Sequence, residues 1–169
     1  MTNFRYRDLA EAIGILAIVA SLIFVGLQIK QSHEIAMAST YQARSQATQE
    51  LKATALSSPD LVSALTKIYG GDYDDITPSE YVALDTYFSA SMSGYENLHY
   101  QHQQGFLPDE HWENNLRELH CWFSLPIYRE IIDGYSYRAS FQNVLDEVIS
   151  TSVKSPDDCW SYTNPIFNN

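Results

Sequence analysis

The sequence predicts an all-α protein in which a single N-terminal transmembrane helix continues into a small helical bundle. Three observations predict this fold. Residues 12–27 (AIGILAIVASLIFVGL) carry no charge and one hydroxyl group. After Lys30, apolar residues recur at the three- and four-residue spacing of amphipathic helices. No segment alternates apolar and polar residues with β-branched enrichment, so we expect no sheet.

Length and charge limit the organisation and the function. With 169 residues, the chain is long enough for one ordinary domain plus an anchor. The net charge of -11 lies entirely beyond the apolar segment, because Arg5 and Arg7 balance Asp8 and Glu11. An acidic domain repels phosphate backbones, so nucleic-acid binding is disfavoured.

The apolar segment is interpreted as a membrane anchor. Eighteen uncharged residues separate Glu11 from Lys30, the lower limit for a helix that crosses about 30 Å of hydrocarbon. No small-residue cleavage site follows, which disfavours a signal peptide. A core helix of so small a domain would keep one polar stripe, and this segment has none. We therefore assign residues 1–11 to a short N-terminal tail and 12–29 to the transmembrane helix.

Small residues form one candidate packing face on the anchor. Their spacings of four, three and four place them on one side of a helix: Ala10, Gly14, Ala17 and Ser21. Small side chains let helices approach closely in lipid, so this face predicts self-association or contact with other membrane protein subunits. Alternatively, such residues are simply common in transmembrane helices.

The charges that flank the anchor favour neither membrane orientation, because the two sides carry equal numbers of basic residues. Arg5 and Arg7 precede the anchor, whereas Lys30 and Arg44 follow it within the range that counts.

Residues 30–150 are predicted to form the bundle. The first helix should continue to about Leu56, because no Gly or Pro occurs between Gln28 and the stop signal Ser57-Ser58-Pro59. A short helix is expected over 60–69, stopped by Gly70-Gly71. Residues 72–75 read as an acidic loop that lacks the glycine and glutamate spacing of a calcium-binding EF-hand.

The clearest local signal is Thr77-Pro78-Ser79-Glu80, a capping box with proline at the first helical position. It predicts a helix that ends near Gly105. Further helices are expected from Pro108 to a break at Pro126, then over 127–133 and 140–150. Residues 151–169 are predicted to be a tail docked on the bundle or on a partner through its apolar side chains, Trp160, Tyr162, Ile166 and Phe167.

One pattern could bind metal. Glu96 and His99 match E-x-x-H, which places a carboxylate and an imidazole on one helix face, as in di-iron bundles. A di-iron site needs a second E-x-x-H pair. The helix that contains His120 is where we would expect it, but Arg117 occupies the position that the glutamate would need. A buried Glu or His satisfied by tyrosine hydroxyls is the commoner arrangement. We therefore predict no catalytic residue, metal or cofactor.

The two cysteines, Cys121 and Cys159, have neither metal-site spacing nor a CxxC motif. They could pair in an oxidising compartment or stay free in a reducing one. Cys121 could also be a small core residue, since it and the adjacent His120 point in different directions on a helix.

Two stretches, residues 21–32 (SLIFVGLQIKQS) and 38–43 (ASTYQA), resemble a broad family of uncharacterised small bacterial membrane-anchored helical proteins. Trp112 and Leu116 match a helix start in that family, and Glu96 matches a glutamate position. The resemblance implies a bacterial inner-membrane location, an anchor and an all-α domain, and it implies no activity. It also favours a cytoplasmic domain, although Arg5 and Arg7 depart from the family's usual charges.

The expected function is therefore that of a non-catalytic, single-pass accessory or scaffolding subunit in a larger membrane protein assembly. Two alternatives remain open. One is a membrane-anchored metalloprotein that uses Glu96 and His99. The other is a small-ligand sensor with a pocket among the tyrosines.

Overall fold

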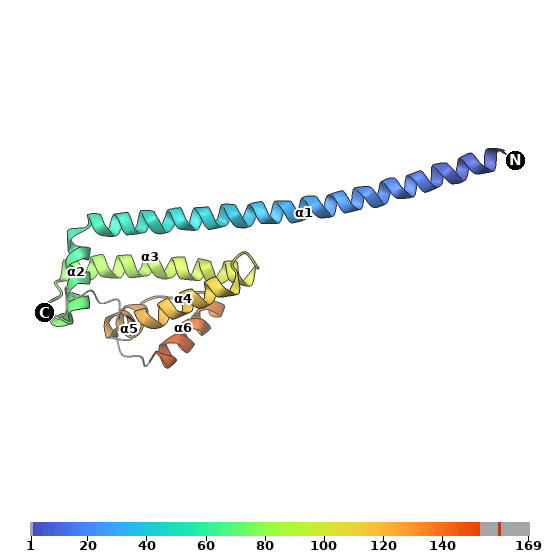
Figure 1. Cartoon of the computed structure of the whole chain (residues 1–169). Coiled ribbons are helices and arrows are strands. Elements are labelled where there is room, and N and C mark those ends of the chain that lie inside the picture. The colour runs from blue at the N-terminus through green and yellow to red at the C-terminus, as the bar shows by residue number, and fades with distance from the viewer. Residues whose placement is uncertain (1, 153–158, 160–169) are drawn as a thin grey trace. The chain divides into compact units, whose positions relative to one another are not determined.

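The computed structural model describes residues 2–152 and Cys159, with side chains from Arg5 onward. This part of the chain holds six α-helices and one 3-10 turn, and no strand occurs within it. In chain order (Figure 1) the elements are α1 (Thr2–Ser57), α2 (Pro59–Gly70), η1 (Tyr73–Asp75), α3 (Pro78–Gln103), α4 (Asp109–Trp122), α5 (Pro126–Ile132) and α6 (Ala139–Thr151). The all-α prediction, with a long apolar helix followed by a helical bundle, is confirmed.

Helix α1 is unbroken, which confirms that the predicted anchor helix continues well beyond residue 29. Residues 2–11, assigned to a tail, belong to the same helix. The helix ends at Ser57 because a residue before proline is pushed out of the helical region. Ser58 precedes Pro59 and takes an extended conformation with φ -97° and ψ 108°.

The chain divides into two compact units, one up to Gln46 and one from Ala47 onward. The first unit consists of α1 residues alone. The second contains the end of α1 and the helices α2–α6, and it forms the helical bundle. This unit begins at Ala47, whereas the sequence placed the start of the bundle at residue 30.

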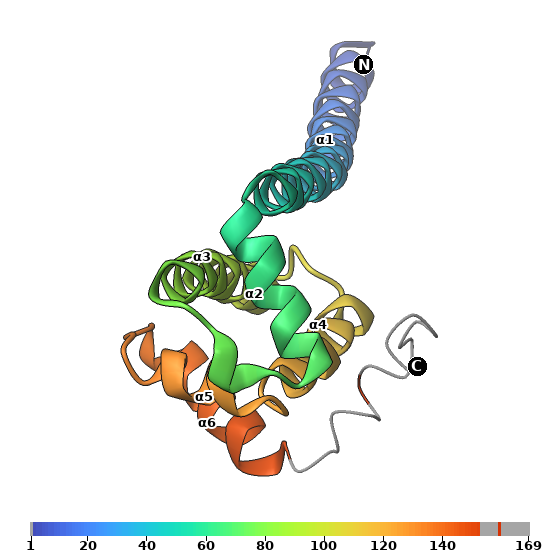
Figure 2. The ribbon, with the colours of Figure 1, turned by 90° about the vertical axis from the view of Figure 1, so that its left-hand side faces the viewer.

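Helix α2 begins and ends with capping interactions. The hydroxyl of Ser58 accepts a hydrogen bond from the Leu61 backbone N–H at 3.3 Å. Gly71 terminates the helix in the left-handed region, with φ 84°, which only glycine adopts freely. The helix is one residue longer at each end than predicted. Figures 1 and 2 show α2 running crosswise to α3 at the N-terminal end of α3.

The acidic segment 72–75, predicted as a loop, contains the 3-10 turn η1. The Ile76 backbone N–H donates to the Tyr73 carbonyl at 3.4 Å and closes the turn. Lys67 Nζ donates to the Asp75 carbonyl at 2.7 Å. The lysine of α2 therefore fixes a segment whose own sequence carries no strong turn signal.

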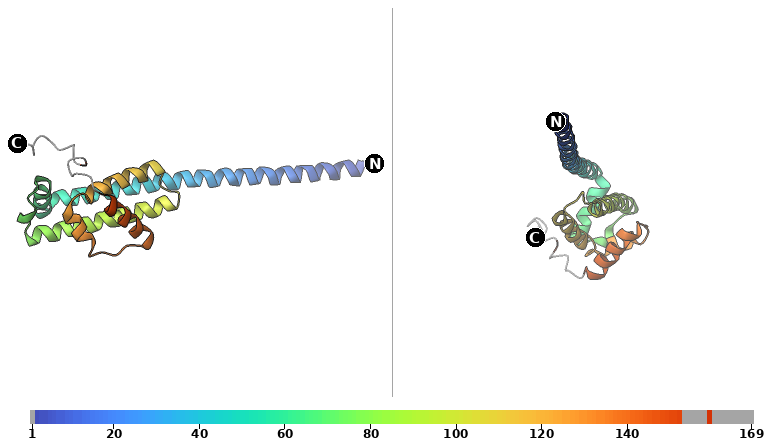
Figure 3. Two further views of the ribbon diagram at one scale, coloured as in Figure 1. Left: turned by 90° about the horizontal axis from the view of Figure 1, so that it is seen from below. Right: turned by 90° about the vertical axis from the view of Figure 1, so that its right-hand side faces the viewer.

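Helices α3 and α4 form an antiparallel hairpin and lie side by side in Figures 1 and 3. Gly105 reverses the chain with φ 75°, close to where the sequence placed the end of α3. Pro108 precedes α4 in an extended conformation, so it starts the helix as predicted.

An aromatic core joins α3, α4 and α5. The fully buried Phe88 ring lies 5.1 Å from the Tyr128 ring, 5.7 Å from Trp122 and 6.1 Å from Phe123, measured between centroids. Such offset and edge-on aromatic pairs stabilise a core beyond the area they bury. Aliphatic and aromatic side chains from neighbouring helices complete the core: Leu61, Ile68, Leu84, Met92, Leu119, Phe141 and Leu145.

Candidate functional site

The first candidate site is the apolar half of α1. Among the described residues, one helix is long and apolar enough to cross a membrane, and none of its most apolar window is buried. Ten large apolar side chains of this segment are exposed: Ile13, Ile15, Leu16, Ile18, Val19, Leu22, Ile23, Phe24, Val25 and Leu27. They cover the helix surface except for one sector of about 100°, which small residues occupy. The apolar character therefore extends all the way round the helix, as the sequence indicated.

The predicted packing face lies on this exposed surface. At about 100° per residue, Ala10, Gly14, Ala17 and Ser21 fall within a sector of about 60°. All four residues are exposed. A Cβ atom added at Gly14 would meet no heavy atom within 4 Å. The face is therefore smooth and open, which is the geometry that close helix packing in lipid requires.

The second candidate site is the E-x-x-H pair on α3. The Glu96 carboxylate accepts a hydrogen bond from the Arg138 backbone N–H at 2.8 Å. Arg138 is the N-cap of α6, which has no side-chain cap of its own. A carboxylate beside a helix N-terminus is stabilised by the helix dipole and by the free N–H groups. Glu96 thus attaches the start of α6 to α3.

His99 is buried between two aromatic rings rather than aimed at a ligand. Its ring centroid lies 5.2 Å from Trp112 on α4 and 5.7 Å from Phe141 on α6. Burial, followed by the nearby His102, lowers the pKa of His99, and Glu96 opposes this shift. A neutral imidazole packed in this way is a core residue.

No group of three or more His, Cys, Asp or Glu side chains that could hold a metal occurs within the described ranges. Two other histidines of the bundle have separate partners: His102 Nε2 lies 3.0 Å from Asp109 Oδ1. His120 Nδ1 lies 3.0 Å from Ser152 Oγ. The structure brings Glu96 and His99 onto one helix, and none of the residues described joins them as a further ligand.

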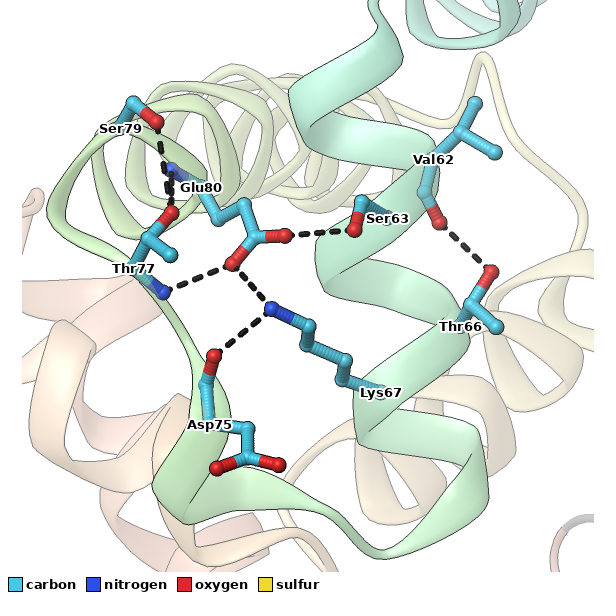
Figure 4. A network of polar contacts seen from close by, with 8 residues as sticks. All are labelled: Val62, Ser63, Thr66, Lys67, Asp75, Thr77, Ser79 and Glu80. Carbon is cyan, nitrogen blue, oxygen red and sulfur yellow. Dashed lines mark hydrogen bonds and ion pairs between the residues drawn. The ribbon is translucent and has the colours of Figure 1, made fainter.

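A polar cluster, only part of which the sequence predicts, surrounds Glu80 (Figure 4). Its carboxylate accepts hydrogen bonds from Thr77 N–H at 2.7 Å, Ser63 Oγ at 2.5 Å and Lys67 Nζ at 2.7 Å. These bonds, led by the one from Lys67, lower the pKa of Glu80 to about 2. The capping box was predicted; the two α2 partners were not, because sequence spacing within α3 carries no information on which helix crosses it.

A second polar cluster holds the end of α6. Ser152 is buried, and its carbonyl accepts a hydrogen bond from Arg129 Nη2 at 2.5 Å. Arg129 Nε also donates to the Phe123 carbonyl at 2.6 Å. Next to His120, Cys121 forms a disulfide with Cys159. Apart from Cys159, the residues of the predicted docking tail that follow Ser152 lie outside the described part of the chain. These include Trp160, Tyr162, Ile166 and Phe167.

An open hollow of about 360 Å³ lies on the bundle. It is lined by Tyr73, Tyr81, Asp74 and Glu130 together with the apolar side chains of Ile76, Pro126 and Ile127. Tyrosine rings and carboxylates are side chains that can hold a cationic group.

Comparison with known proteins gives no identification. No protein-family model matches the chain, and no curated protein or solved structure is significantly similar to it.

Proposed function

We propose that this chain is a single-pass membrane protein that acts as an accessory or scaffolding subunit of a larger membrane protein assembly. The observation that carries the proposal is the exposed apolar surface of α1. Its anchor would occupy residues 12–29, and the bundle would form the water-facing domain.

The magnitude of that exposure supports a lipid environment. Covering one large apolar side chain stabilises a protein by about 2 kcal/mol. Ten such side chains are exposed between Ala12 and Leu27, so covering them is worth on the order of 10–20 kcal/mol. A whole domain is stable by only about 5–15 kcal/mol, so a solvent-exposed segment of this kind would be a large liability in water.

The small-residue face supports association with a second helix. In lipid, apolar surface alone does not drive helices together, and close backbone packing does. We also propose that the chain belongs to the bacterial family of membrane-anchored helical proteins that it resembles, and that it resides in the inner membrane. The exit stretch at residues 21–32, which carries the resemblance, lies within α1.

Purification in mild detergent tests this function. We expect the full-length protein to migrate as an oligomer or with a partner, and Gly14→Leu to disrupt that complex. Gly26→Leu is the matched control, because Gly26 lies about 120° away from Gly14 around the helix and is equally open to an added side chain. A strictly monomeric particle, or equal behaviour of the two variants, would contradict the proposal.

The hollow beside η1 favours a ligand sensor as the second candidate. Two tyrosines and two carboxylates line it, so a quaternary ammonium compound is the natural probe. We expect such a compound to raise the melting temperature of the protein, and Asp74→Asn to reduce that shift. The metalloprotein alternative gains no support, because Glu96 bonds to Arg138 and His99 packs between rings.

A further inference from the structure

The disulfide bears on which side of the membrane the bundle occupies. Cys121 lies on α4 and Cys159 follows α6, and their Cα atoms are 5.2 Å apart. That separation lies within the usual range for disulfides, about 4.4–6.8 Å. The two thiols are therefore paired without displacement of either backbone.

Contacts of Ser152 hold the end of α6 beside the residue that precedes Cys121. Ser152 ends α6 and contacts His120, the neighbour of Cys121, as well as Arg129 of α5. The end of α6 is thus held against the C-terminal part of α4 independently of the sulfur atoms.

Paired cysteines of this structural kind form and persist in oxidising compartments, whereas cytoplasmic thiols are kept reduced. We propose that the bundle lies on the extracytoplasmic, oxidising side of the membrane and that the N-terminal residues before the anchor lie in the cytoplasm. This inference rests on the proposed membrane function and adds the compartment in which a partner of the bundle must be found.

The charges flanking the anchor are compatible with that orientation. Basic residues favour the cytoplasmic side, and their influence declines within about 15–20 residues of the membrane. Arg5 and Arg7 are both close to the segment, whereas only Lys30 is close on the other side and Arg44 lies at the far edge of this range. The excess of acidic residues in the bundle has little effect on its translocation across the membrane. The flanking charges hardly distinguish the two orientations, so the disulfide is the stronger indication of the side on which the bundle lies. It favours the extracytoplasmic side, whereas the family resemblance favours a cytoplasmic domain.

Thiol trapping and a topology reporter on the full-length protein test the proposal together. The protein is expressed in the inner membrane of a bacterial host, acid-quenched and alkylated with a maleimide polymer. We expect no gel shift without reductant and two additions after reduction. Cys121→Ser and Cys159→Ser, the matched controls, should each show one addition without reductant.

In parallel, alkaline phosphatase or green fluorescent protein is fused after Asn169. Phosphatase activity without fluorescence is the expected result, and fluorescence without phosphatase activity would overturn the orientation. Free thiols in the unreduced sample would also overturn the proposal, whatever the reporters show. Extraction with alkaline carbonate distinguishes a failure of the proposed function from a failure of the orientation. Release of the protein from the membrane would overturn the proposed function itself. Retention in the membrane together with a fluorescent fusion would overturn the orientation alone.

Discussion

Phe24 and Phe88 occupy helices of the same chain and have opposite surroundings. Phe88 in α3 is fully buried among Trp122, Phe123 and Tyr128. Phe24 in α1 is 61% exposed, and its large apolar neighbours in that segment are exposed as well. The second unit supplies its own apolar interior, whereas residues 12–27 of the first unit expose their large apolar side chains. This difference is the physical basis for the proposal that residues 12–29 lie in lipid and the bundle lies in water.

The comparison predicts unequal effects for the same substitution. Phe88→Ala should lower the free energy of unfolding of the bundle by about 4 kcal/mol, because it leaves a cavity in a packed core. Phe24→Ala should change it by less than about 0.5 kcal/mol. Chemical denaturation in mild detergent, followed by tryptophan fluorescence, measures both values. Equal losses would mean that Phe24 also belongs to a folded core.

Arginine substitutions compare the proposed membrane segment of α1 with the part of the same helix that follows it. Ile18 and Ile35 are both 62% exposed, yet only Ile18 lies in the predicted membrane segment. Ile18→Arg should disfavour membrane insertion by about 3 kcal/mol and reduce the membrane-bound fraction. Ile35→Arg should leave that fraction unchanged. Quantitative fractionation after expression provides the measurement, and equal retention of the two variants would count against a lipid-embedded segment.

Local patterns made most of the fold predictable from the sequence. The Thr77–Glu80 capping box and the prolines at Pro59 and Pro126 act on the chain nearby, so the ends of α2, α3, α5 and α6 were placed to within two residues. The start of α1 was wrong, because residues 2–11 belong to the helix rather than to a tail. Helix α4 ends at Trp122, before the predicted break at Pro126. The turn η1 was missed because Lys67, which fixes it, belongs to another helix.

The polar sites could not be predicted to the same degree, because they depend on which helices meet. Glu96 and His99 share a helix face, as their spacing indicated. Their partners on α4 and α6, and the pairing of Cys121 with Cys159, arise only once the bundle is assembled. Sequence spacing describes one helix at a time, and these contacts join several.

Removing a cap within the bundle should have a smaller effect than emptying its core. Thr77→Ala removes the hydroxyl that accepts a hydrogen bond from the Glu80 backbone N–H and should cost about 1 kcal/mol. Thr86→Ala is the control, because the Thr86 hydroxyl bonds only to the Val82 carbonyl of its own helix. Thermal denaturation should rank Thr77→Ala as clearly less stable than Thr86→Ala, and a reversed order would contradict the capping role.

Acid should affect the two units differently. The pKa of Glu80 lies at about 2, below the ordinary value of 4.5. Its contribution to stability is therefore complete above about pH 4.5 and is lost as the pH falls toward 2. Glu80→Gln should flatten the decline of the bundle's melting temperature over this range, whereas Glu113→Gln, at an exposed position, should not. Residues 12–29 contain no titratable group, so helical signal from the anchor should persist in acid.

Hydrogen–deuterium exchange in lipid nanodiscs tests the lipid location of the anchor most directly. Bilayer hydrocarbon excludes water, so amides of residues 12–27 should exchange much more slowly than those of residues 30–46, although both segments belong to one continuous helix. The contrast should vanish when the lipid is removed. Uniform exchange along residues 5–46 in nanodiscs would contradict the account, because it would mean that the apolar side chains of α1 do not lie in the membrane.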